Sequence, residues 1–164
     1  MNRLFGIVVT SLLSFSGSHI QERHPAIAYV TKIVKDVERR DSVTTEWIKA
    51  SPASQLTIGC EVRTREESFV LIRFTDGSQV AVRSQSAIRI LGDVSRGKLQ
   101  NPGVFIERGH AIFNVKQQKA GGFHFTSPVS VSSIGKGEGG FSFDSNTSHA
   151  VLTVRSGAVE FSST

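Results

Sequence analysis

Alternating apolar residues on both sides of an Asp-Gly pair are the feature that most constrains the fold of this chain. These apolar residues are Val70, Ile72 and Phe74 before the pair, and Val80 and Val82 after it. Both turn residues accept positive φ at low cost, so this pattern predicts a β-hairpin with a tight turn. We therefore assign Asp76 and Gly77 as structural turn residues, with the Asp76 carboxylate bonded to the backbone of its own turn.

The same rhythm of short alternating runs recurs toward the C-terminus. The runs lie at residues 111–115, 123–125, 129–131, 141–143, 152–154 and 159–161. Short runs separated by turn residues predict an all-β fold of short antiparallel strands, either a β-sandwich or a short β-solenoid. A content of 11 Phe and 15 Gly agrees with half-buried strands joined by glycine-containing turns.

Two segments do not follow this rhythm. Residues 26–40 fit an amphipathic helix by the spacing of their apolar residues, but their β-branched content also permits a strand. The segment from Gly92 to Gly103, which contains Pro102, is predicted to be a long loop.

The first 18 residues are predicted to be a signal peptide. Arg3 precedes an apolar run from Leu4 to Leu13, and the small residues that follow permit cleavage after Ser16 or Ser18. A buried N-terminal strand is the alternative. The run is shorter than the roughly 20 residues of a membrane-spanning helix. We therefore expect a periplasmic or secreted protein with no integral membrane span in the mature chain, and one β-domain over residues 26–162.

The positive charge of the chain is spread thinly. The net charge of +5 is not concentrated in any basic block, so nucleic acid is not an expected partner. By alternation, Arg73, Arg83 and Arg89 face away from the apolar strand residues and form a candidate partner-binding face. The first interpretation of this face is a solubilising role, and the second is contact with an acidic partner.

The order of the motifs resembles that of the FecR domain family. GCEVRT at residues 59–64 corresponds to the family pattern G-D-x-[VI]-R-T, and F-x-D-G-S follows at residues 74–78. The downstream runs at residues 109–115, 123–128 and 154–159 keep the family's order. The resemblance covers about residues 26–162 and implies an extracytoplasmic, β-rich domain.

The chain departs from this family pattern at three places. Cys60 replaces the usual acidic residue, Ser127-Pro128 replaces Thr-Pro, and the glycine-rich segment 134–141 replaces V-R-G-T-x-F. We expect this glycine-rich segment to connect two strands, with Lys136 and Glu138 as a candidate mobile loop that contacts a partner. FecR-type sigma regulators also carry a cytoplasmic segment, a transmembrane helix and a C-terminal signalling subdomain. The chain resembles their ectodomain alone, as a stand-alone domain.

The sequence marks no catalytic, cofactor-binding or metal-binding residues, and no cofactor is expected. The five histidines lack the spacings that place two imidazoles on one metal ion, and the glycine-rich segment lacks the P-loop order. The single cysteine, Cys60, is expected to be a buried free thiol, and Trp47 is expected to pack in the core.

These observations favour an exported, non-catalytic FecR-like domain that binds an envelope protein in sensing or signalling. A glycan or small-ligand module is the alternative, which gains support if Trp47, Tyr29 and several Phe lie exposed in one groove. A metal-dependent enzyme that uses the scattered histidines is the third hypothesis.

Overall fold

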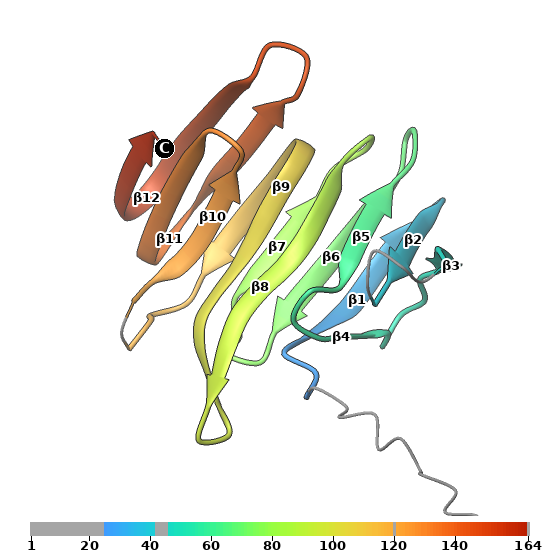
Figure 1. Cartoon of the computed structure of the whole chain (residues 1–164), viewed down its shortest axis with the longest axis horizontal. Helices are drawn as coiled ribbons and strands as arrows, with labels where there is room; N and C mark the ends of the chain where they lie inside the picture. Colours follow the sequence, from blue (N-terminus) through green and yellow to red (C-terminus); the bar gives the residue numbers. More distant parts are fainter. Residues whose placement is uncertain (1–24, 42–45, 120, 164) are drawn as a thin grey trace, which may run out of the picture.

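The described residues of the chain form one curled sheet of twelve strands (Figure 1). The computed structural model describes residues 25–41, 46–119 and 121–163, so the predicted signal peptide at residues 1–18 lies outside the described residues. The strands are β1 (Ala28–Val34), β2 (Val37–Arg40), β3 (Ile48–Lys49), β4 (Gln55–Leu56), β5 (Glu61–Thr64), β6 (Phe69–Phe74), β7 (Gln79–Val82), β8 (Ala87–Ser95), β9 (Lys98–Val115), β10 (Phe123–Ser127), β11 (Ser130–Asp144) and β12 (His149–Ser163).

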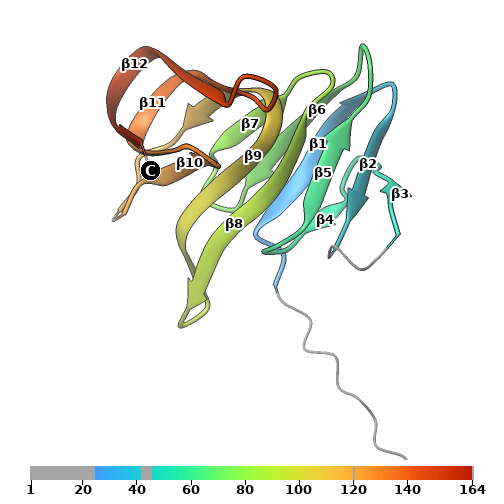
Figure 2. The same cartoon turned by 45° about the horizontal axis from the view of Figure 1, so that its top comes forward.

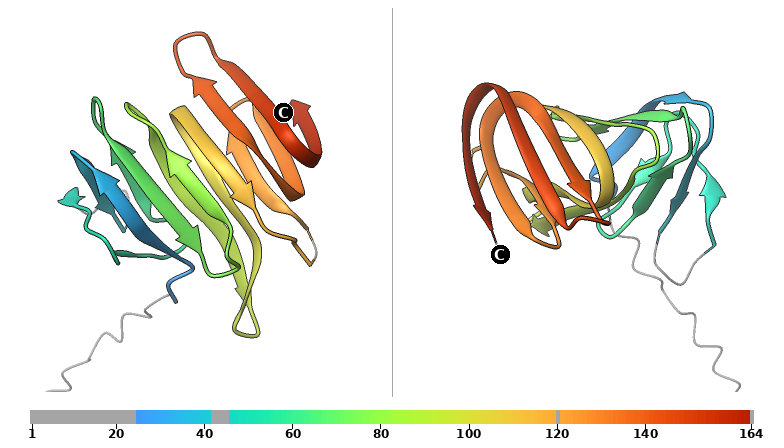
Figure 3. Two further views of the ribbon diagram at one scale, coloured as in Figure 1. Left: turned by 180° about the vertical axis from the view of Figure 1, so that it is seen from behind. Right: turned by 90° about the horizontal axis from the view of Figure 1, so that it is seen from above.

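The all-β prediction is confirmed, and the sheet curls into a half-barrel (Figures 2 and 3). The described residues contain no helix, and therefore no helix that could cross a bilayer. All the strand pairs are antiparallel except that of β9 with β10, which is parallel.

The half-barrel has two walls, and the chain passes between them at sharp corners. We call one of them the groove wall, because its outer surface carries a groove. It contains β1, β6, β7, residues 109–115 of β9 and the parts of β11 and β12 paired beside them. The opposite wall contains β2, β5, β8, residues 98–108 of β9 and β10. Each corner holds a residue with positive φ: Lys35 at 58°, Glu67 at 51°, Gln85 at 55° and Gly109 at 97°.

Hydrogen bonds donated by backbone amides join neighbouring corners into a stack. The Arg65 amide donates to the Asp36 carbonyl at 3.1 Å, and the Gln85 amide donates to the Arg65 carbonyl at 3.1 Å. The His110 amide donates to Ser86 Oγ at 3.0 Å. These bonds satisfy backbone groups where the strand ladders are interrupted, so the corners hold the two walls at a fixed angle.

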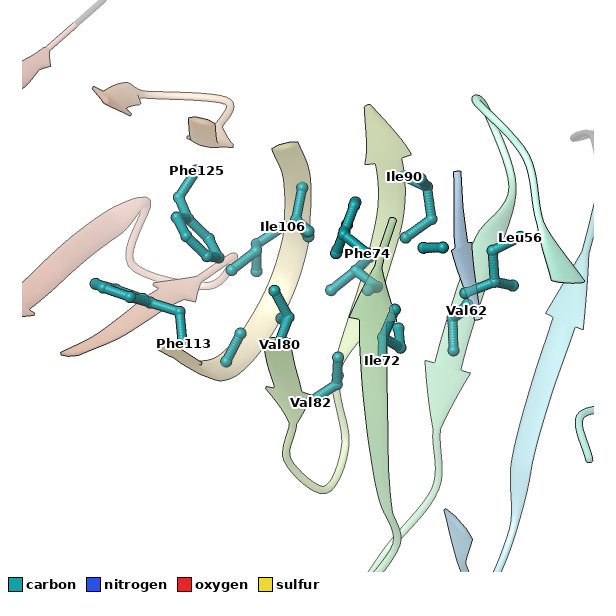
Figure 4. Packing of buried hydrophobic residues seen from close by; sticks show 14 of the residues in the cluster. Leu56, Val62, Ile72, Phe74, Val80, Val82, Ile90, Ile106, Phe113 and Phe125 are labelled. Atoms are coloured by element: carbon teal, nitrogen blue, oxygen red, sulfur yellow. The ribbon is translucent and has the colours of Figure 1, made fainter. Parts of the chain in front are cut away.

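One apolar cluster fills the half-barrel, with residues from both walls. Its largest fully buried members are Phe74, Phe113, Phe123, Phe125, Phe141, Leu56, Ile72, Ile88, Ile90, Ile106 and Ile134. The predicted alternation in β6 and β7 is confirmed, since every second residue of both strands is buried (Figure 4). Cys60 is a buried free thiol, as predicted, and burial raises its pKa.

Residues 26–40 form two strands instead of a helix. β1 pairs with β6 and β4, while β2 pairs with β5 and β3, so a corner at Lys35 sends the two strands into different walls. The helical spacing of the apolar residues was therefore coincidental, because the β-branched side chains in it lie on strands.

The predicted loop from Gly92 to Gly103 is a hairpin instead. β8 and β9 pair up to Ser95 and Lys98, with Arg96 and Gly97 in the turn, and this hairpin projects from the body of the molecule (Figure 1). The register shifts between Leu91 and Asp93, opposite the residues around Pro102. A bulge leaves one residue out of the ladder, so a proline there does not interrupt the strand.

Candidate functional site

The outer surface of the groove wall carries a shallow groove of about 510 Å³. Its floor follows one line of register across five strands, from Leu71 to Ala81, Ile112, Gly140 and Thr153. A Cβ added at Gly140 would lie 3.2 Å from His110 Cε1, so the absence of a side chain at this position keeps the groove open. Ile112 remains 42% exposed in the middle of the floor, which leaves apolar surface for a ligand.

Polar side chains form the rims of this floor. The next line of register runs through Arg73, Gln79, Asn114 and Glu138. Asn114 Nδ2 donates to Glu138 Oε1 at 2.6 Å, which holds the carboxylate against the rim. His110 forms part of the other rim, and Arg155 also lines the groove. We call this surface, from Arg73 through the groove to Arg155, the groove face.

The cations of the groove face are largely uncompensated. Arg73 and Arg83 are exposed, and neither they nor Arg155 form an ion pair with a described side chain. Glu138 is the one carboxylate among the residues that line the groove. The groove face therefore combines an apolar floor with a positive potential, which attracts acidic groups.

Burial lowers the pKa of His110, and the nearby Arg83 guanidinium lowers it further. The neutral imidazole is thus favoured in the folded protein. Because the folded pKa lies below the unfolded one, the contribution of His110 to stability is present above about pH 6.5. This contribution is lost as the pH falls through the folded pKa.

We expect the Arg83→Gln variant to have a higher His110 pKa than the unsubstituted protein, although still below the ordinary value because burial remains. An NMR titration of the imidazole signals measures both values. Arg96→Gln, in the turn of the β8–β9 hairpin, is the matched control and should leave the His110 pKa unchanged. Equal His110 pKa values in the Arg83→Gln variant and the unsubstituted protein would contradict this electrostatic coupling.

The outer surface of the opposite wall carries a network of ion pairs that the sequence pattern did not predict. Glu61 is 3% exposed, and its carboxylate lies 2.6 Å from Arg40 Nη2 and 3.1 Å from Arg89 Nη2. Arg89 also reaches Glu107 at 3.3 Å. Arg40, Glu61 and Arg89 lie side by side because their three strands pair in register. No local sequence motif predicts this arrangement.

Trp47 is not a core residue, which corrects the sequence-based expectation. Its ring lies against two guanidinium groups, with Arg63 Cζ at 4.0 Å and Arg40 Cζ at 4.5 Å from the ring centroid. Arg63 also donates from Nε to Glu38 at 2.7 Å, and this hydrogen bond lowers the pKa of Glu38. The half-buried ring is thus part of a charged surface on the opposite wall.

The three arginines of the predicted partner-binding face do not lie on one surface. Arg73 of β6 and Arg83 after β7 belong to the groove wall, whereas Arg89 of β8 belongs to the opposite wall. All three point away from the apolar cluster, but the corner at residues 83–86 separates Arg89 from the others. Arg89 is also occupied by Glu61 and Glu107.

Lys136 and Glu138 lie inside strand β11 and not in a loop. This part of β11 is paired with β12, and from Gly137 onward also with β9. A Cβ at Gly137 would collide with the Ser156 carbonyl oxygen, and a Cβ at Gly139 with that of Thr153. The glycines therefore permit close approach of neighbouring strands, as glycine in a strand interior commonly does.

Asp76 and Gly77 lie in the turn between β6 and β7. Asp76 Oδ1 accepts from the Ser78 amide at 2.8 Å, and Asp76 Oδ2 accepts from Ser78 Oγ at 2.9 Å. Gly77 has a φ of +88°. These bonds explain the side-chain types at this turn.

No group of three or more His, Cys, Asp or Glu side chains in residues 25–41, 46–119 and 121–163 is arranged to hold a metal ion. His110 lies on the groove wall, His124 in β10 and His149 at the start of β12. Within the described part of the chain, the groove face brings exposed apolar side chains together with arginines that form no ion pair there.

Comparison with known protein families gives one assignment. A family model described as FecR protein matches residues 61–160. No curated protein and no solved structure matches the chain. The match begins within the GCEVRT motif at residues 59–64 and includes most strands of both walls. FecR is a regulatory family of envelope signalling, and its domains are extracytoplasmic. The twelve-stranded half-barrel described here belongs to the FecR protein family.

Proposed function

We propose that this chain is an exported, non-catalytic FecR domain that binds an acidic segment of an envelope protein through its groove face. The observation that carries this proposal is the combination of an exposed apolar floor with cations that form no ion pair with any described side chain. Ile112 supplies the centre of that floor, and Arg73 and Arg83 supply the cations.

The contrast between the two walls supports an acidic partner. On the opposite wall, Glu38 and Glu61 each accept from two arginines, so these four arginines already have anionic partners within the chain. Among the described residues that line the groove, Glu138 alone carries a carboxylate. An acidic ligand would therefore gain attraction on the groove face and little on the opposite wall.

A charge placed in the groove floor tests this function. We expect Ile112→Glu to weaken binding of the envelope partner by at least about tenfold, because the new carboxylate is buried against apolar surface and repels an acidic ligand. The partner is obtained by crosslinking in an envelope fraction, and its affinity is then measured with the purified proteins at several salt concentrations. Binding should weaken as the salt concentration rises.

Val94→Glu is the matched control. Val94 lies on the β8–β9 hairpin and is 39% exposed, close to the value for Ile112, so the two variants carry the same chemical change on different surfaces. Equal loss of binding in both variants, or binding that is insensitive to salt, would contradict the groove as the site. The lack of any reproducible protein partner would contradict the binding function itself.

The described residues do not form the exposed aromatic groove that would support a glycan-binding module. Tyr29 lies on the groove wall beside Arg73, whereas Trp47 lies on the opposite wall between two arginines. Most large phenylalanine side chains are buried in the cluster. Aromatic rings therefore do not line one exposed groove, and no observation favours glycan stacking over an acidic peptide.

A further inference from the structure

The sheet ends very differently at its two edges. At one end, the short strands β3 and β4, of two residues each, cover β2 and β1. At the other end lies β12, which is 15 residues long and pairs only with β11 among the described strands (Figures 1 and 3). A long edge strand presents a row of backbone donors and acceptors that is a ready template for another strand.

The apolar interior is also open at the β12 end. Leu152 and Val159 pair with the buried Phe141 and Ile134, and both pack against the apolar cluster. Phe161 lies two residues beyond Val159, and alternation along the strand directs it to the same side. It is nevertheless 49% exposed, since no described strand lies beyond β12. A neighbour on this edge would bury these side chains.

The shape of β12 restricts which strand fits beside it. The strand turns from one wall to the other at Gly157, which has a φ of +99° and pairs with Gly137 of β11. An antiparallel neighbour must turn at the same level, with a residue small enough to pass the bend. β12 itself meets this requirement, because a second copy of the strand has its own Gly157 at its bend.

The charges of β12 complement each other in that arrangement. Arg155 and Glu160 carry the strand's formal charges, and neither forms an ion pair with a described side chain. Arg155 lies two residues before Gly157 and Glu160 lies three residues after it. Arg155 is the extra residue of a bulge, because its neighbours Val154 and Ser156 pair with the adjacent Gly139 and Glu138. Its side chain lines the outer groove, and Glu160 also lies on the outer surface, since it alternates with the inward-packed Val159. When two antiparallel copies align their bends, each Arg155 therefore lies close to Glu160 of the other copy on the same face, which gives two ion pairs.

We propose that β12 is the interface of a symmetric homodimer, in which β12 of a second copy adds antiparallel to this edge and continues the curled sheet. The same surface of both copies meets, as a two-fold axis requires. The second copy supplies hydrogen-bonding groups along the edge, apolar cover for Phe161 and its neighbours, and an opposite charge for Arg155 and Glu160. The dimer contact at the sheet edge meets the groove face at Arg155, whereas Ile112 in the middle of the groove floor lies on β9, two strands away from that edge.

Charge reversal and rescue test the dimer. Sedimentation equilibrium of the purified protein over a range of micromolar concentrations should show a monomer–dimer equilibrium. We expect Glu160→Arg and Arg155→Glu each to weaken dimerisation by about tenfold or more, because each substitution places like charges side by side twice. The double variant, Arg155→Glu with Glu160→Arg, should restore the affinity of the unsubstituted protein.

Glu46→Arg is the matched control, since Glu46 is exposed beside β3, at the other end of the sheet from β12. It should leave the dimer unchanged, and circular dichroism checks that each variant is folded. A protein that stays monomeric at every concentration would overturn the dimer. So would a dimer that neither single reversal weakens, or one that the double variant does not restore. Loss of groove binding in Ile112→Glu with an intact dimer separates this inference from the proposed function.

Discussion

Replacing Phe125 with alanine is expected to lower the free energy of unfolding by about 3 to 5 kcal/mol. The ring is fully buried, and its centroid lies 4.8 Å from that of Phe113, 5.1 Å from that of Phe123 and 6.0 Å from that of Phe141. These rings come from β9, β10 and β11, so the cavity would open where three strands meet. A loss of this size is a large fraction of the 5 to 15 kcal/mol that typically stabilises a domain.

Chemical denaturation followed by tryptophan fluorescence measures this loss, because the chain has one tryptophan, Trp47. Phe125→Leu is the control variant, since it keeps an apolar side chain of similar volume and is expected to cost less than about 1.5 kcal/mol. A loss below about 1 kcal/mol in Phe125→Ala would show that the cluster collapses around the cavity and that the packing described here is not rigid.

Replacing Gly109 with alanine is expected to destabilise the fold by roughly 3 kcal/mol, through two effects that add. Gly109 has a φ of +97°, which a residue with a Cβ adopts only with strain. The new Cβ would also lie 2.6 Å from Ser86 Cα, where the β9 corner passes the corner between β7 and β8. The backbone at Ser86 is held by its amide, which donates to Thr64 Oγ1 at 3.0 Å, so it has little freedom to move.

Gly97→Ala separates strain from collision. Gly97 has a φ of +72°, but a Cβ there would meet nothing within 4 Å. The control should therefore cost about 1 kcal/mol, the conformational part alone. Thermal or chemical unfolding of the two variants gives the comparison. Equal losses at positions 97 and 109 would contradict close packing of the corners.

The parts of the fold that the sequence predicted correctly rest on local physical chemistry. The hairpin around Asp76 and Gly77 depends on alternation and on turn residues that are adjacent in the chain, and both survive in the structure. The all-β class follows from the same alternation. The burial of Cys60 also agrees with the usual behaviour of a lone thiol.

The errors arose where tertiary contacts override local pattern. The β8–β9 hairpin contains Gly92 and Pro102, which locally indicate a loop, but long-range pairing accommodates them at a bulge. The glycine-rich part of β11 has no apolar alternation, yet paired strands on both sides hold it in the sheet. Trp47 is a large aromatic residue of the kind that commonly packs in a core, but arginines from two other strands contact its ring at the surface.

The candidate site could not be predicted from spacing, because its floor is a line of register and not a motif. Leu71, Ala81, Ile112, Gly140 and Thr153 come from five strands, and only the pairing of these strands aligns them. Alternation correctly directed Arg73, Arg83 and Arg89 away from the core. It could not show that a corner sends Arg89 into the other wall, where carboxylates neutralise it.

By itself, then, the sequence determined the all-β class, the central hairpin and its turn, and the family motifs, because each depends on residues close together in the chain. The tertiary structure alone decided the curl of the sheet, the groove face and the open edge at β12. Those features depend on which distant strands pair and where each strand bends, and the bends are set by contacts such as that of Gly109 with Ser86. Such contacts leave no periodic signal, since each joins residues that lie far apart in the sequence.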